Sequence, residues 1–140
     1  MAGLSAAAKY RRIAKELLKV PSQVSKEAAL GIEKMWRRSY MAGTDPYGND
    51  WAANKPSTIK KKGHDWVMVD SEETLKLTRV RPLPGAGIGL KTGPNASYHL
   101  EATATRPARP VLPLYGMPKA WTAYMKKIYV ERAQKAVRSG

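Results

Sequence analysis

The chain has 140 residues, of which 43% are hydrophobic and 26% are charged, as in a soluble globular protein of about one domain. Cysteine is absent, which excludes disulfides and thiolate metal sites and fits a reducing compartment. The excess of 25 Lys and Arg over 11 Asp and Glu leaves a net charge of +14. That charge indicates a polyanion or an acidic protein surface as a neighbour.

Residues 1–43 carry the apolar spacing of helices. From Leu4 to Val20 one face is apolar and the other is basic, and the apolar residues are Tyr10, Ile13, Ala14, Leu17 and Leu18. After Pro21 the same period continues through Val24, Ala28, Ile32, Met35, Trp36 and Tyr40. The proline predicts a kink that divides the region into two helices, and Gly43 suits the end of the second. No run approaches the roughly 20 apolar residues of a membrane span, and basic residues break the Ala-rich start, so we expect a soluble chain without a targeting segment.

Residues 44–65 are predicted to form a loop, because positions 45–51 are dense in turn formers. Tyr47 and Trp51 are the aromatic residues of this turn. Trp51 has two interpretations: it folds back to pin the loop to the core, or it contacts another subunit.

Residues 66–105 are predicted to form an antiparallel sheet of three to four strands. The strand signals lie at 66–69, at 74–80, where apolar and polar residues alternate, at 88–92 and at 96–104. Two prolines and two glycines within 82–87 indicate a hairpin connection. A final helix over 118–138 carries the apolar stripe Trp121, Tyr124, Met125, Ile128 and Tyr129. The chain is therefore predicted to be a single α+β domain over residues 1–140.

Between sheet and helix, residues 106–117 are predicted to form an extended arm rich in proline and arginine. Its core is Arg106-Pro107-Ala108-Arg109-Pro110, in which prolines forbid both helix and central strand. Such a stiff segment holds two guanidinium groups at fixed spacing and is suited to contact a partner. The alternative is that Arg109 forms an internal salt bridge that anchors the arm to its own sheet.

Catalytic and cofactor motifs are weak. His64 and His99, the two histidines, lie in no metal-ligand spacing, and no nucleophile motif accompanies them. We therefore expect no enzyme activity and no cofactor.

Several landmarks follow one another in a familiar order. The turn Gly48-Asn49-Asp50-Trp51, the pair Tyr98-His99 and the arm at 106–112 before the last helix resemble the virion-morphogenesis family of tailed phages. The resemblance runs from about Gly43 to the C-terminal helix. Glu72 and Ala102 depart from it, because glycine is common at both places in the family.

The resemblance implies a neck or tail-completion protein at the head-to-tail interface of the virion. Such a subunit forms a homo-oligomeric ring between the portal complex and the tail tube, through which DNA passes. On this interpretation the subunit-interface residues are Tyr47, Trp51, Arg106, Pro107, Arg109 and Pro110. The rival hypothesis, based on the net charge, is a basic module that binds nucleic acid without sequence preference.

Overall fold

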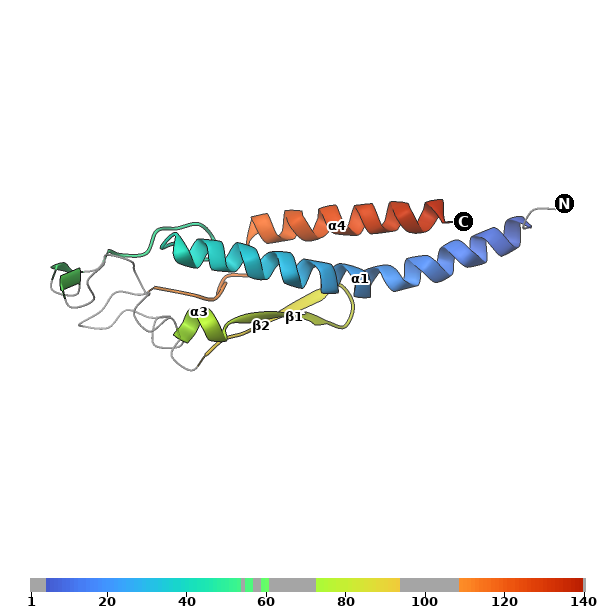
Figure 1. Cartoon of the computed structure of the whole chain (residues 1–140). Coiled ribbons are helices and arrows are strands. Elements are labelled where there is room, and N and C mark those ends of the chain that lie inside the picture. Colours follow the sequence, from blue (N-terminus) through green and yellow to red (C-terminus); the bar gives the residue numbers. More distant parts are fainter. Residues whose placement is uncertain (1–4, 54, 57–58, 61–72, 94–108, 140) are drawn as a thin grey trace.

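The computed structural model describes residues 5–53, 55–56, 59–60, 73–93 and 109–139. Its elements are α1 (Ala6–Met41), α3 (Glu73–Leu77), β1 (Arg79–Leu83), β2 (Gly87–Lys91) and α4 (Lys119–Arg138). Helix α1 is central, with α4 along one side and the β1–β2 hairpin along another (Figure 1). The prediction of mixed helix and sheet is confirmed. The described residues form one two-stranded antiparallel sheet, fewer strands than the three to four predicted.

Helix α1 runs without a break through Pro21, so the prediction of two separate helices was wrong. It begins at Ser5, whose hydroxyl accepts a hydrogen bond from the amide of Ala8 at 3.1 Å. A proline inside a helix costs about 3 kcal/mol. Val20 and Val24 lie on either side of it and are both buried, and each buried side chain contributes roughly 1.5–3 kcal/mol. Their burial offsets the proline.

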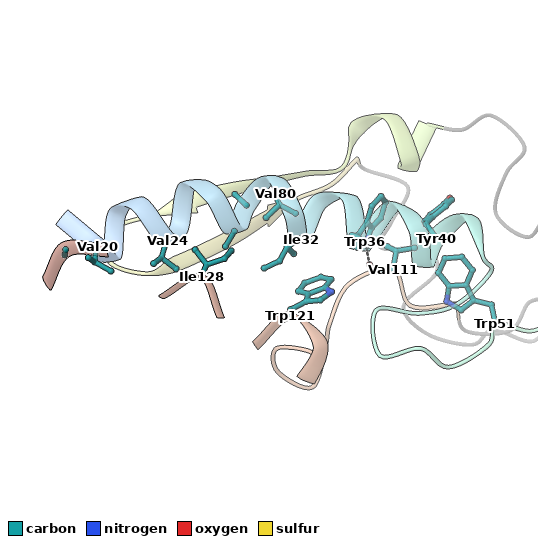
Figure 2. Packing of buried hydrophobic residues seen from close by; sticks show 13 residues of the cluster. Val20, Val24, Ile32, Trp36, Tyr40, Trp51, Val80, Val111, Trp121 and Ile128 are labelled. Atoms are coloured by element: carbon teal, nitrogen blue, oxygen red, sulfur yellow. Dashed lines mark hydrogen bonds between the residues drawn. The ribbon is translucent and has the colours of Figure 1, made fainter. Parts of the chain in front are cut away.

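The core is built on the second half of α1. Its buried residues there include Val24, Ala28, Ile32, Trp36 and Tyr40, which confirms the stripe predicted for this segment. Trp121 and Ile128 from α4, Val80 from β1, and Val111 complete the packing around them (Figure 2). Three elements from distant parts of the chain therefore converge on one helix face.

The hairpin is fixed to α1 as well as to itself. Its register pairs Val80 with Leu90 and Leu83 with Gly87, and β2 matches the returning strand predicted at 88–92 to within one residue. The amide of Val80 donates to a carboxylate oxygen of Glu33 at 3.0 Å. Since Glu33 belongs to α1, this bond ties the hairpin to the central helix.

The strand predicted to open at Thr74 was wrong, because residues 73–77 form helix α3. The amide and the hydroxyl of Thr78 both donate to the carbonyl of Thr74, at 3.1 and 2.7 Å. Both threonines are buried, whereas Leu77, expected on the buried strand face, is largely exposed. A short segment can match both the two-residue period of a strand and the period of about four residues of a helix. Here Thr74 and Thr78, which are four residues apart, are the buried positions, as in a helix.

Other predicted segments are described in part. In the predicted loop 44–65, an isolated bridge joins Thr44 to Asp50, and the amide of Ile59 donates to the carbonyl of Lys55 as in a helical turn. The strands predicted at 66–69 and 96–104 lie outside the described residues.

Helix α4 confirms the predicted final helix and packs closely on α1. Pro118 occupies its N-cap position, and Trp121 and Ile128 are buried. The ring of Tyr124 of α4 packs against Gly31 of α1, where an added Cβ would clash with the phenol group. Only glycine leaves room for the ring at this position.

We predict that Gly31→Ala lowers the free energy of unfolding, although alanine has the better helix propensity by about 1 kcal/mol. Overpacking costs roughly 1–3 kcal/mol and outweighs that gain. In a Tyr124→Ala background the same substitution is expected to stabilise the helix. Denaturant unfolding of the four proteins measures both effects, and stabilisation by Gly31→Ala in the unmodified chain would contradict the packing described.

Candidate assembly surface

The described end of the proline-rich arm is held against its own chain. The indole N–H of Trp36 donates to the carbonyl of Val111 at 2.7 Å (Figure 2), and that of Trp51 donates to the carbonyl of Pro110 at 3.0 Å. Val111 itself is fully buried. Two successive carbonyls thus each receive an indole N–H, which fixes the segment beside the C-terminal part of α1.

Arg109 is part of the same internal arrangement. Its Nε donates to the carbonyl of Ala52 at 3.0 Å and a terminal nitrogen donates to the carbonyl of Ala53 at 3.1 Å. Partial burial lowers the pKa of Arg109, yet a guanidinium stays protonated in proteins. Arg109 therefore anchors the described end of the arm to the loop through backbone carbonyls, which differs from the salt bridge to the sheet that the alternative predicted.

Trp51 pins its loop to the core, as one of its two interpretations holds. It is 8% exposed, its amide donates to the carbonyl of Gly43 at 2.8 Å, and its ring meets that of Tyr40 edge-on at 5.2 Å. Burial raises the pKa of Tyr40 to about 12, against a hydrogen bond with Thr74 that lowers it. The phenol of Tyr40 is therefore neutral at physiological pH.

Tyr47 links the same loop to the segment before α4. Its hydroxyl accepts from the amide of Tyr115 at 2.7 Å and donates to the carbonyl of Gly116 at 2.5 Å. Together with the contacts of Trp36, Trp51 and Arg109, these bonds form an arrangement that we call the loop clasp. The clasp joins residues 47–53 to residues 109–116.

The structure thus brings Tyr47, Trp51, Arg109 and Pro110 together, while Arg106 and Pro107 lie outside the described residues. Tyr47, Trp51 and Arg109, and the carbonyl of Pro110, form hydrogen bonds within the chain. Their role between subunits stays a prediction, and their observed role is to fix a loop.

Sequence reasoning missed a larger exposed feature on α1. The N-terminal end of α1 extends beyond the C-terminal end of α4 (Figure 1). We call residues 6–19 the projecting half, although Glu16 within it still lies beside Arg132 and Lys135 of α4. Three large apolar residues are exposed there: Tyr10 by 71%, Leu17 by 38% and Leu18 by 82%. These three form the apolar stripe. At 100° per residue it continues the face that is buried further along α1.

The projecting half is basic on its other side. Arg12, Lys15 and Lys19 are exposed and lie opposite the apolar stripe by helical geometry. Lys19 pairs with Glu16 at 2.9 Å, an exposed contact of small energetic value. The sequence did show a helix with one apolar and one basic face, but it gave no sign that the apolar side chains of Tyr10 and Leu18 are exposed.

A second apolar surface lies beside α4. A groove of about 520 Å³ is lined by Val24 of α1, Ala86 of the hairpin turn, and the α4 residues Thr122, Met125, Tyr129 and Val130. Tyr129 and Val130 are both more than 40% exposed. We call this surface the α4 groove. Unlike the loop clasp, the α4 groove has exposed apolar side chains.

Among the residues that the structure describes, no group of three or more His, Asp or Glu side chains lies close enough to hold a metal ion. In that part of the chain no helix has the length and apolar character of a membrane span. His64 and His99 lie outside the described residues. No family model, curated protein or solved structure matches the chain.

The loop clasp predicts that Trp51→Phe and Arg109→Met each lower the free energy of unfolding by about 1 kcal/mol. Trp51→Phe removes the donor to the half-buried carbonyl of Pro110, and Arg109→Met removes both donors to the exposed carbonyls of Ala52 and Ala53. Hydrogen exchange of the backbone amide of residue 51 is expected to be faster in both variants. Arg12→Met, at an exposed arginine of α1, is the matched control. If Arg109→Met behaved like that control, the clasp would not depend on the guanidinium.

Proposed function

We propose that this protein is a structural subunit of a tailed-phage virion, which forms a ring in the neck between the portal complex and the tail and lets DNA pass. It works through protein interfaces and not by catalysis. The sequence landmarks from the Gly48–Trp51 turn to the proline-rich arm support the proposal as a resemblance.

One structural observation carries the proposal: the apolar face of α1 continues past the elements that cover it. Tyr10 and Leu18 are more than two-thirds exposed on this face. A monomer gains nothing from an uncovered apolar stripe of this kind, whereas such patches mark sites of protein association. The stripe suits a subunit that completes its packing on a neighbour.

The loop clasp supports the same function in a second way. Trp36, Trp51 and Arg109 hold the loop and the arm in one geometry before any partner is present. Binding then costs less conformational entropy, because fewer groups become ordered at the interface. We propose that the exposed side of the clasp contacts another neck component. Arg106 and Pro107, which lie outside the described residues, are proposed from the sequence as part of the same interface.

The proposal predicts that the purified chain, alone or with portal-side and tail-tube proteins, forms a closed ring with a central opening. Mass photometry gives the number of copies, and negative-stain electron microscopy shows the opening. A chain that stays monomeric beside every neck and tail component would contradict it.

The basic side of α1 favours a second candidate, nonspecific nucleic-acid binding. Arg12, Lys15 and Lys19 form an exposed row along the projecting half. A protein that neutralises 6–10 phosphates loses about 10³–10⁵-fold in duplex affinity between 50 and 200 mM salt. A monomer with that steep salt dependence would favour the second candidate, and a ring with weak DNA binding favours the first.

A further inference from the structure

We infer that one side of α1, along most of its length, contacts the phosphates of duplex DNA. Six basic residues form this side, which we call the basic ridge: Arg12, Lys15, Lys19, Lys26, Lys34 and Arg37. The inference rests on the proposed function, because it names the side of the subunit that is turned to the DNA passing through the ring. It also extends the basic row of the projecting half into the packed half of α1.

The basic ridge follows one line on the helix. At 100° per residue its six members fall within a sector of about 100°, on the side of α1 away from the buried Ile32. From Arg12 to Arg37 this line is roughly 38 Å long at 1.5 Å per residue. In the packed half it lies between the hairpin, which Glu33 contacts, and α4, which Gly31 contacts. Arg37 is half-buried, and the other five members are exposed.

The positive charge of the ridge is largely unbalanced. Two acidic residues share its sector, and both are engaged within the chain. Glu16 pairs with Lys19 at 2.9 Å, and Glu33 accepts the amide of Val80 at 3.0 Å. Six basic residues against two acidic ones leave this side of α1 with a net charge of +4. Within the described ranges, no ion pair involves Arg12, Lys15, Lys26, Lys34 or Arg37.

The spacing of these charges differs from that of a helix side that is only solvated. Such a side mixes the two signs, because Glu–Lys pairs three or four residues apart stabilise a helix and like charges at the same spacing destabilise it. The ridge repeats the positive sign at this spacing, from Arg12 to Lys15 to Lys19 and again from Lys34 to Arg37. A bound polyanion offsets this repulsion, whereas water and salt only screen it.

The C-terminal end of α4 adds to the same side. A hollow of about 210 Å³ is lined by residues of both helices, which include Glu16 and Gln23 of α1 and Arg132, Lys135 and Ser139 of α4. Gln23 lies in the sector of the ridge by helical geometry, so Lys135 lies at the edge of the ridge. Arg132 pairs with Glu27 at 2.9 Å, whereas Lys135 is exposed. The positive surface therefore comes from both helices.

The composition of the ridge favours duplex DNA over an acidic protein or a single strand. Protein interfaces are anchored by aromatic residues near their centre, and single strands are held by aromatic side chains on which bases stack. No aromatic residue lies in the sector of the ridge between Arg12 and Arg37. The phosphates of a duplex need positive charge and hydrogen-bond donors, which Arg and Lys supply. Such contact is nonspecific, so DNA of any sequence can pass.

The ridge leaves the apolar stripe free for a neighbouring subunit. Tyr10, Leu17 and Leu18 lie on roughly the opposite side of α1 from the ridge. Arg11 lies on the side of the stripe and is not part of the ridge. One helix can therefore contact a second subunit with one side and DNA with the other.

Two variants with equal loss of charge test the ridge. The ridge variant replaces four exposed members by glutamine: Arg12→Gln, Lys19→Gln, Lys26→Gln and Lys34→Gln. The control variant replaces four exposed basic residues of the hairpin and α4 that lie outside the ridge: Arg81→Gln, Lys91→Gln, Lys119→Gln and Lys126→Gln. Glutamine suits exposed positions and keeps helix propensity, so both variants are expected to fold, and circular dichroism with thermal melting checks this.

Fluorescence anisotropy with a labelled duplex of arbitrary sequence measures the affinity between 50 and 200 mM salt. Each phosphate contact contributes about 0.9 to the slope of log affinity against log salt. The ridge variant should therefore lower this slope by about 3 to 4 and the affinity at 100 mM salt by tenfold or more, while the control variant keeps the slope. Equal losses in the two variants would overturn the ridge, because the affinity would then follow net charge alone.

Two further probes test the choice of partner. A labelled single strand of the same length and poly-L-glutamate are expected to bind more weakly than the duplex. Tighter binding of the single strand, or equal binding of poly-L-glutamate, would overturn the assignment to duplex DNA. The second result would indicate an acidic protein surface in its place.

Ring formation by the same variants separates the ridge from the proposed function. Rings that form while the ridge variant binds duplex DNA as the control variant does would overturn the ridge and leave the function standing. Duplex binding that depends on the ridge in a chain that never forms rings would support the ridge and contradict the ring. A chain that forms no rings and binds no duplex at 50 mM salt would overturn both.

Discussion

The structure depends on one continuous apolar face of α1. Over the second half of the helix this face is covered by Trp121 and Ile128 of α4, by Val80 of β1 and by Val111. Two hydrogen bonds fix the covering elements to α1. The amide of Val80 in the hairpin donates to Glu33, and the indole N–H of Trp36 donates to the carbonyl of Val111 in the arm. Over residues 6–19, Tyr10, Leu17 and Leu18 of the same face are exposed. The same apolar face of α1 thus packs within the chain along its second half, and we propose that it packs against another chain along residues 6–19.

The division between the two halves has a physical cause in the lengths of the elements. Helix α1 has 36 residues, whereas α4 has 20 and each strand has five. At 1.5 Å per residue α4 covers roughly 30 Å of a helix that is about 54 Å long. An isolated helical segment is only marginally stable in water, so the projecting half is held by its continuity with the buried half and by the Ser5 cap.

Helix periodicity predicted the two long helices, and the Pro/Gly signal between 82 and 87 predicted the hairpin. The helix break at Pro21 was wrong because local propensity does not register that Val20 and Val24 are both buried. The prediction of a strand from Thr74 was wrong because a segment of five residues can match the period of a strand as well as that of a helix. The sequence brought Tyr47, Trp51, Arg109 and Pro110 to attention, yet hydrogen bonds to Ala52 and Pro110 depend on tertiary contacts that no local pattern shows. The exposure of the apolar stripe could not be predicted for the same reason, since a sequence pattern identifies an apolar face but not which elements pack on it.

Amide hydrogen exchange across α1 tests the central claim most directly. In a dilute solution of single subunits, residues 6–19 should exchange much faster than the buried segment around Ile32, because most of their side chains are exposed. On assembly, protection should rise in residues 6–19 and stay unchanged around Ile32. Equal exchange of residues 6–19 in the free and assembled states would contradict the account that this half of the helix is completed by a neighbouring copy.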